Sequence, residues 1–247
     1  MDIQKPFLKW LGGKTQLIKD IIKYIPKEMN SYHEIFLGGG SVLLALCCLQ
    51  KLGHVKINEK IHACDLNRYL INTYKVIQDN PIELYDAIMI LLDTYKNIEY
   101  KSINRNPSNI EEALTSKESY YYWIRKDFNT KIKNKEESID TAALFIFINK
   151  ICFRGMYREG PNGYNVPYGH YKTVPKVINK DDLPNISELI KDVEFKVCDF
   201  NDSMKLIKKG DFVYLDPPYV QENKFSFTSY TSDGFNDDKH NKLFDEI

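Results

Sequence analysis

The chain has 247 residues, 43% of them hydrophobic and 13% aromatic, enough for a substantial core in one large domain or in a domain that carries an insertion. Its formal net charge is +0, so no overall field favours a nucleic-acid partner. Five cysteines without a C-x-x-C pair argue against a zinc or disulfide framework, and the lack of a signal core or bilayer-long apolar run predicts a soluble, intracellular protein with no membrane segment.

The first motif is a glycine pair, Gly12-Gly13, which ends a short extended segment ahead of a predicted helix from 14 to about 24. A glycine pair at a helix start lets backbone amides approach an anionic group, and Lys14 adds positive charge there. A capped helix without a ligand explains the same pattern.

A strand, a glycine-rich turn and an apolar helix are predicted where residues 34–46 read EIFLGGGSVLLAL. This is the first unit of a nucleotide-binding sheet, although the spacing lacks the full G-x-G-x-x-G pattern. A second strand, 61–64, ends in Asp65, at a suitable distance past the glycines for an acidic residue that binds ribose hydroxyls. The alternative for Asp65 is the N-cap of a helix that begins at Asp65-Leu66-Asn67.

Helical patterns interrupt the strand-helix alternation from about residue 70 to 174, and they indicate an inserted helical domain. The predicted helices cover 71–78, 81–92, 119–128 and 139–152. Residues 120–180 contain 11 Lys and Arg against 5 Asp and Glu, a net charge of +6. Basic charge mixed with aromatic residues is typical of contacts to a nucleic-acid backbone, and an ordinary solvated surface is the alternative.

A long loop follows the last of these helices, in the segment 149–171, and is rich in Gly, Pro, Asn, Arg and Tyr. Loops of this length are uncommon unless they bind something. Arg158 has the side chain to fork onto a guanine edge, and Tyr171 to contact a base or a phosphate.

Two further strands end in acidic residues. The strand 193–197 precedes Asp199-Phe200, where Asp199 is placed to meet an adenine amino group or, alternatively, to cap a helix. The strand 212–215 precedes Asp216-Pro217-Pro218-Tyr219, and the prolines force the chain out of the sheet. Asp216 and the carbonyl of Pro217 are suited to accept the two hydrogens of a planar amino group, with Tyr219 stacked on its ring. A surface Asp in a Pro-Pro turn is the alternative.

Taken together, these segments resemble the Dam family of DNA adenine-N6 methyltransferases. The likeness rests on the segments 7–14, 36–41, 65–67, 149–172, 199–200, 216–219 and 227–230, which follow the family's order across the chain. It implies an adenine-specific enzyme that uses S-adenosylmethionine on double-stranded DNA. It also implies a doubly wound, Rossmann-like α/β sheet in 1–70 and 175–247, with a helical DNA-recognition domain inserted at 71–174.

The same resemblance implies roles for individual residues. The catalytic motif is Asp216, Pro217, Pro218 and Tyr219. The implied cofactor-binding set is Trp10, Gly12, Lys14, Phe36, Gly38, Gly40, Asp65, Asp199, Phe200 and Asp216. The implied DNA-binding set is Lys9, Arg154, Arg158, Asn165, Pro167 and Tyr171. The reaction needs no metal, because positioning of a flipped adenine supplies most of the acceleration.

The target and the partners follow less directly. Lys9, Arg158 and Tyr171 match the family's readers of GATC, whereas Arg154 replaces an Asn found in many members and leaves a site such as CATG open; Ile35 in place of Pro matters little. The family continues beyond Ile247 with further strands, so we expect a fragment or a sheet completed by another segment. A cognate restriction endonuclease is a possible partner.

Three alternatives to this function remain open from the sequence. A cytosine-N4 methyltransferase uses the same amino-group chemistry, although Asp216 within these motifs favours adenine. A protein or RNA methyltransferase more often carries Asn at that position and does not need the segment 149–172. A chain without turnover that binds only cofactor or DNA is the non-enzymatic alternative.

Overall fold

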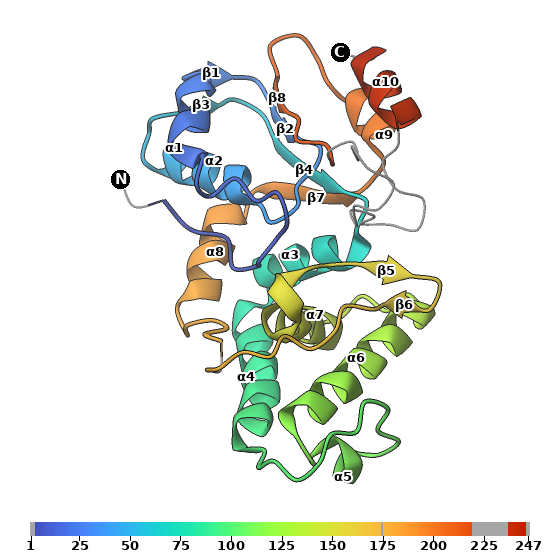
Figure 1. Cartoon of the computed structure of the whole chain (residues 1–247). Helices are drawn as coiled ribbons and strands as arrows, with labels where there is room; N and C mark the ends of the chain where they lie inside the picture. Colours follow the sequence, from blue (N-terminus) through green and yellow to red (C-terminus); the bar gives the residue numbers. More distant parts are fainter. Residues whose placement is uncertain (1–2, 174, 219–236, 246–247) are drawn as a thin grey trace.

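The computed structural model describes residues 3–173, 175–218 and 237–245, and it contains a four-stranded parallel sheet (Figure 1). The strand order is β7-β4-β2-β8, and every neighbouring pair is parallel. The bounds are Tyr32–Glu34 for β2, Ile61–Asp65 for β4, Val193–Val197 for β7 and Phe212–Tyr214 for β8. Because all four strands run the same way, their carboxyl ends share one edge, and the mixed α/β class with a parallel sheet is confirmed.

The strand order reverses at β2. The chain moves from β2 through β4 to β7 in one direction, and then returns across the sheet to place β8 on the other side of β2. The first connection is α2, Ser41–Lys51, and the last carries α9, Phe200–Met204. Ligands of open α/β sheets bind at the carboxyl edge where the order reverses, which points to the ends of β2 and β8.

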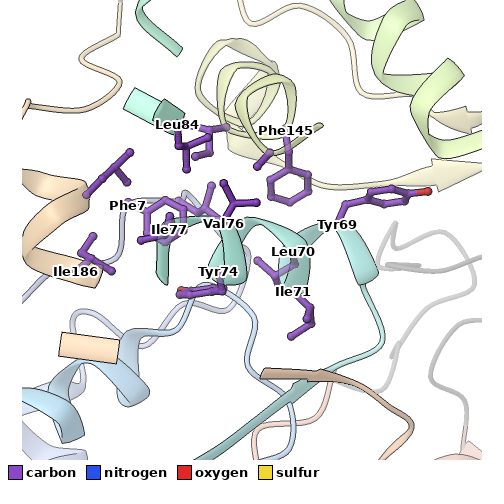
Figure 2. Packing of buried hydrophobic residues seen from close by; sticks show 14 of the residues in the cluster. Phe7, Tyr69, Leu70, Ile71, Tyr74, Val76, Ile77, Leu84, Phe145 and Ile186 are labelled. Atoms are coloured by element: carbon purple, nitrogen blue, oxygen red, sulfur yellow. The ribbon is translucent and has the colours of Figure 1, made fainter. Parts of the chain in front are cut away.

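Helix α3, Arg68–Asp79, joins the sheet to the helical half of the molecule. Figure 2 shows Val76 and Ile77 pointing toward Leu84 and Phe145, while Tyr74 lies on the opposite side of the helix. The Tyr74 ring stacks on Phe195 of β7 with a centroid separation of 5.1 Å. One continuous core therefore runs from the sheet through α3 into the helices, and the boundary expected after residue 70 falls inside α3.

The helical half is built around one buried helix. Its elements are α4 (Pro81–Asn97), α5 (Ile110–Ala113), α6 (Lys117–Asn134), α7 (Ile139–Ile151) and α8 (Asp182–Ile190). Eleven residues of α7 are buried, as expected for an apolar helix without a polar face. Ser116 and Ser138 cap α6 and α7 by accepting backbone N–H groups of the first turn. The four predicted helices are confirmed, although α3 begins earlier, α4 ends later and α6 is longer at both ends than predicted.

Other predicted boundaries are wrong. The predicted helix from residue 14 begins only at α1, Ile18–Ile21, and continues as the 3-10 helix Ile22–Tyr24, because residues 14–17 form turns. Strand β2 ends at Glu34 rather than within the apolar run, since Leu37 N–H bonds back to the carbonyl of Cys64. Helix α7 stops at Ile151 because Cys152 is extended and pairs with Tyr168.

Small two-stranded pairs complete the fold. Strands β1 (Glu28–Met29) and β3 (Lys56–Ile57) are parallel, and β5 (Glu159–Gly160) and β6 (Gly163–Tyr164) form an antiparallel hairpin. The last described helix, α10, covers Asp237–Asp245, and its Leu243 packs with Phe200 against Ile35. No helix in the three described ranges is long and apolar enough to cross a bilayer.

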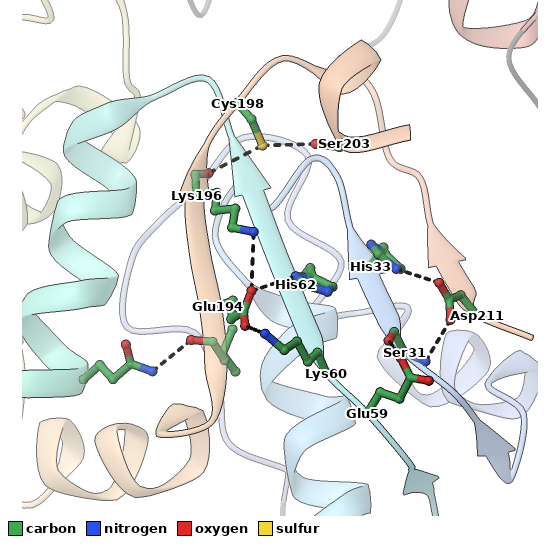
Figure 3. A network of polar contacts seen from close by, with 12 residues as sticks. Ser31, His33, Glu59, Lys60, His62, Glu194, Lys196, Cys198, Ser203 and Asp211 are labelled. Atoms are coloured by element: carbon green, nitrogen blue, oxygen red, sulfur yellow. Dashed lines mark hydrogen bonds and ion pairs between the residues drawn. The ribbon is translucent and has the colours of Figure 1, made fainter. Parts of the chain in front are cut away.

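Polar contacts fix the start of β8, as Figure 3 shows. The Asp211 carboxylate lies 3.1 Å from His33 Nε2 on β2 and accepts the Ser31 N–H at 3.0 Å. On the neighbouring strands, Glu194 of β7 pairs with Lys60 and with His62 of β4. Because Asp211 is bonded to residues on both sides of the β2 start, the register of β8, and with it the position of Asp216, is set from the opposite end of the strand.

Candidate active site

A cavity of about 320 Å³ opens at the carboxyl edge of the sheet, where the strand order reverses. Three neighbouring strands contribute an acidic residue at or just past their ends: Glu34 from β2, Asp65 from β4 and, just past β8, Asp216. The sequence-predicted residues that line this cavity are Trp10, Gly12, Lys14, Phe36, Gly38, Asp65, Phe200, Asp216, Pro217 and Pro218. Segments more than two hundred residues apart in the chain thus meet in one site.

The glycine turn is shaped by its neighbours as much as by the cavity. Gly38 has φ of +50°, and a Cβ at this position would lie 2.9 Å from the Trp10 ring. Gly40 has φ of +68°, and a Cβ there would lie 2.1 Å from Tyr74 Oη, which donates to the Gly39 carbonyl at 3.0 Å. Gly40 is the N-cap residue of α2 and does not line the cavity, so its contact is with Tyr74.

Asp65 organises the backbone on its side of the cavity. One carboxylate oxygen accepts the Gly38 N–H and the other accepts the Asn67 N–H, both at 2.9 Å. The residue that caps α3 is Asn67, whose side chain accepts from Tyr69 and Leu70. Burial raises the pKa of Asp65, and the backbone hydrogen bonds act against this rise. Asp65 therefore ties the glycine turn to the start of α3 and is not the cap residue.

Asp216 is paired with a cation inside the site. Lys14 Nζ forms an ion pair with Asp216 Oδ2 and donates to the carbonyl of Gly12 at 2.7 Å. Both side chains are mostly buried, with 14% of Lys14 and 24% of Asp216 exposed. The pair links the N-terminal glycine motif to the end of β8. Tyr219, the last residue of the predicted catalytic motif, lies outside the described residues.

Aromatic rings form the walls of the cavity. Trp10 stacks on Tyr157 at a centroid separation of 5.8 Å and an interplanar angle of 21°, and Phe36 stacks on Phe200 at 6.2 Å and 30°. Next to Phe200, the Asp199 side chain accepts the Asn201 N–H at 3.0 Å and caps α9, and it does not line the cavity. Flat apolar walls of this kind suit a planar ring.

Glu34 is a cavity residue that the sequence motifs did not single out. It is 2% exposed, and Tyr32 Oη donates to its carboxylate at 2.7 Å. Burial raises the pKa of Glu34 to about 8, and the negative charge of Asp216 acts in the same direction, whereas the bond from Tyr32 acts against it. No local signal marks Glu34, because β2 reads Tyr32-His33-Glu34 and the apolar run that predicted the strand begins only at Ile35. The pairing of β2 with β4 and β8 places Glu34 at this edge of the sheet.

Comparison with known proteins identifies the family. The family model described as D12 class N6 adenine-specific DNA methyltransferase matches residues 10–246. The chain belongs to this D12 class. It is an adenine-specific DNA methyltransferase, and the resemblance to Dam enzymes is confirmed.

Relatives of this D12-class chain are found in archaea and bacteria. The type II methyltransferase M.MjaIII of Methanocaldococcus jannaschii is 39% identical over 246 residues, which cover 97% of this chain and 78% of that protein. The type II methyltransferase M1.LlaDCHI of Lactococcus lactis is 32% identical, with 98% and 75% covered. The DNA adenine methylase of Haemophilus influenzae is 29% identical, with 94% and 70% covered.

The residues expected to face DNA in this D12-class enzyme fall into two groups. In the first, Lys9 Nζ lies 4.8 Å from the centroid of the Tyr171 ring, and Tyr171 Oη donates to the Cys152 carbonyl at 2.8 Å. Asn149 holds the backbone of Lys9 from α7, because its amide accepts the Lys9 N–H at 3.0 Å and donates to the Lys9 carbonyl at 2.8 Å. Sequence inspection had not assigned Asn149 this positioning role.

Arg154 and Pro167 belong to the same group. Arg154 has φ of +57°, and its guanidinium lies 5.1 Å from the ring centroid of Phe153, which is 44% exposed. The Pro167 carbonyl accepts the Phe153 N–H at 2.9 Å. Gly155, which follows Arg154 in the chain, packs on Lys9, since a Cβ at this glycine would lie 2.4 Å from Lys9 Cβ. The tight turn at Arg154 is therefore surrounded by two cations, Lys9 and Arg154, and by two exposed apolar side chains, Phe153 and Pro167.

Arg158 and Asn165 form the second group, on the β5–β6 hairpin. Arg158 Nε donates to Asn165 Oδ1 at 2.6 Å, and the Asn165 N–H donates to the Arg158 carbonyl at 3.1 Å. Together these bonds orient the guanidinium along the hairpin. Across the described parts of the chain, no cluster of three His, Cys, Asp or Glu side chains is arranged to hold a metal ion.

Proposed function

We propose that this enzyme transfers the methyl group of S-adenosylmethionine to the N6 atom of an adenine flipped out of a DNA duplex. The observation that carries the proposal is the meeting of Asp65, the aromatic walls and Asp216-Pro217 in one cavity at the reversal point of the sheet. When bound, the cofactor supplies an electrophilic methyl group.

The cavity fits a nucleoside with an anionic and a cationic end. Phe36, Phe200 and Trp10 offer flat apolar surfaces for a base. Each oxygen of Asp65 accepts one backbone N–H, and each retains a lone pair for a ribose hydroxyl. Lys14 offers positive charge beside the glycine pair. In this proposal Gly38, Gly40 and Asp199 shape the pocket, Gly40 through Tyr74 and Asp199 through the cap of α9.

The reacting amino group needs help because its lone pair is delocalised into the adenine ring. Asp216 Oδ and the carbonyl of Pro217 are proposed to accept its two hydrogens, which favours a pyramidal, nucleophilic nitrogen. The Lys14 ammonium pairs with one carboxylate oxygen of Asp216 and so helps to hold the side chain in place for that role. Flipping the base costs a few kcal/mol of stacking and pairing, and we propose that Tyr219, two residues after Pro217, stacks on the flipped ring.

We propose residues 71–174 as the DNA-recognition part, inserted between the catalytic segments 1–70 and 175–247. The net charge of +6 over 120–180 and the exposed Arg154 beside Phe153 support this division. The proposed target is GATC, read by Lys9, Arg158 and Tyr171, with Arg154, Asn165 and Pro167 shaping the same surface. Arg154 favours CATG as the second candidate. A restriction endonuclease with the same target is the proposed partner.

Sequencing a plasmid from a host that lacks its own adenine methylation tests the proposed function. Expression of this chain should place N6-methyladenine in GATC sites of the plasmid, and the Asp216→Ala variant, expressed at the same level, should leave them unmodified. Methylation confined to CATG would show that the target is CATG instead of GATC, and the proposed reaction would still hold. A plasmid without methyladenine, from cells that contain folded protein, would overturn the proposed function.

Arg158→Ala should relax target choice more than it weakens binding to DNA as a whole. A bidentate guanidinium-guanine pair contributes about 1–3 kcal/mol of discrimination, or roughly 5- to 150-fold between target and near-target sites. The plasmid assay reads this as methylation at sites that differ from the target by one outer base pair. Lys133→Ala, on the exposed side of α6, is the control and should retain full discrimination. If Arg158→Ala retains it as well, Arg158 contacts phosphate and the GATC assignment loses its main support.

A further inference from the structure

A second hollow, of about 820 Å³, lies on the part of the molecule formed by the N-terminal segment, the end of α2 and helix α8. Four lysines line it, Lys5, Lys51, Lys150 and Lys176, against one acidic residue, Asp182. We call it the lysine groove. Both oxygens of Asp182 are already engaged, because they accept hydrogen bonds from the backbone and side-chain amides of Asn179 at 2.8–3.1 Å. Four lysines against one carboxylate give the groove a formal net charge of +3.

Lys150, near the end of α7, is the most informative of the four. Its side chain lines the groove although the residue is only 9% exposed. Within the described ranges, its ammonium forms no hydrogen bond and no ion pair, and none of the other three lysines forms an ion pair. Burial lowers the pKa of Lys150 to about 8, and the nearby charge of Lys9 adds to this effect, whereas Asp182 opposes it. Most of the Lys150 side chain is buried while its ammonium reaches the groove, where an anion would pair with it.

The position of the groove indicates which anion it meets. One wall is the segment from Ile3 to Phe7, which continues directly into Lys9 of the DNA-facing group. Lys150 follows Asn149, the residue that holds the Lys9 backbone. Figure 1 shows this N-terminal segment running from the side of α8 toward the yellow turn that follows α7. The lysine groove thus adjoins the surface proposed to read the target.

We propose that the lysine groove binds phosphates of the DNA strand that flanks the target sequence. Lysine ammoniums are point charges that bind phosphate oxygens without reading sequence, so the contacts add affinity and set the register of the duplex. This inference rests on the proposed function, because it extends the same DNA surface beyond the base-reading residues. Free phosphate or pyrophosphate shares the chemistry, and the experiment separates the two sources.

Binding of duplexes of two lengths tests the inference. Fluorescence anisotropy compares a short duplex that ends near the target with a longer duplex that extends beyond it on both sides, for wild-type protein and for Lys150→Met, which keeps an unbranched apolar side chain. The variant should lose about three- to tenfold in affinity for the long duplex and little for the short one. The slope of log K against log salt concentration should fall by about 0.9 for one lost phosphate contact, on the long duplex alone.

Two further variants keep the test sharp. Lys51→Gln removes an exposed lysine of the groove and should repeat the length-dependent loss even if Lys150→Met folds poorly. Lys133→Gln removes an exposed lysine of α6 outside the groove and should not show the length-dependent loss. Equal losses on both duplexes, or none, would overturn the inference. The inference would also be overturned if pyrophosphate raised the melting temperature of wild type but not of Lys150→Met, while Lys150→Met kept the wild-type affinity for DNA.

The outcome is independent of the target assignment. If GATC is the wrong target, the preference for GATC over a scrambled duplex disappears, but the dependence on duplex length remains measurable with the scrambled sequence. If the methyl-transfer proposal is wrong, methylation of the plasmid fails while the anisotropy experiment still reports phosphate contacts. The failure of one proposal can therefore be told from the failure of the other.

Discussion

Asp216→Ala should lower methyl transfer to DNA by at least about 10²–10³-fold while leaving the affinity for DNA nearly unchanged. The carboxylate is proposed to hold the amino group only in the reacting geometry, and removal of one such preorganised electrostatic partner costs this much in other enzymes. The substitution also leaves the Lys14 ammonium in the site without its carboxylate. Transfer of labelled methyl groups to a target duplex measures the first effect, and anisotropy measures the second.

Two controls bracket this result. Asp202→Ala removes an exposed carboxylate of α9 that pairs with Lys205 at 2.8 Å, and it should retain wild-type turnover. Asp216→Asn keeps a carbonyl oxygen that accepts one amino hydrogen, so its turnover should lie between wild type and Asp216→Ala. Normal turnover by Asp216→Ala would end the mechanism proposed above, whereas loss of DNA binding together with turnover would place Asp216 in the framework of the site.

Glu34→Gln should remove a loss of stability that the wild-type protein shows as the pH rises. Burial raises the pKa of Glu34 from 4.5 to about 8, so the folded protein retains a proton that the unfolded chain releases. The contribution of this group to stability is therefore complete below pH 4.5 and is lost as the pH rises through 8. At about 1.4 kcal/mol per pKa unit, the rise from 4.5 to about 8 sets an upper limit of about 5 kcal/mol on this contribution.

The measurement is the free energy of unfolding in urea between pH 5 and pH 8. Wild type should lose stability relative to Glu34→Gln across this range, since an amide still accepts the bond from Tyr32 and has no proton to lose. Glu99→Gln, an exposed control, should follow the wild-type curve. Glu34→Ala should be less stable than Glu34→Gln, because it leaves the buried Tyr32 hydroxyl without its acceptor. A constant difference between wild type and Glu34→Gln would mean that Glu34 is ionised throughout.

Local signals predicted much of the architecture and of the site. The apolar run before Asp216 and the prolines after it marked the end of β8, since a sheet ladder cannot continue through two prolines. The strand, glycine turn and apolar helix around Gly38 likewise predicted β2 and α2, and the line of motifs predicted the family. These features depend on neighbours in the chain, which is why a single sequence reveals them.

Roles that depend on distant partners follow from long-range contacts. Gly40 contacts Tyr74 of α3, and Glu34 is buried beside Asp216 by the pairing of β2 with β8, contacts that no local pattern encodes. Asp199 and Asn67 show the same limit, because a cap and a ligand site use the same residue types at a helix start. Local sequence places Asp65 and Asp216 where strands end, and the strand order β7-β4-β2-β8 brings them together with Glu34, since long-range pairing sets their distances.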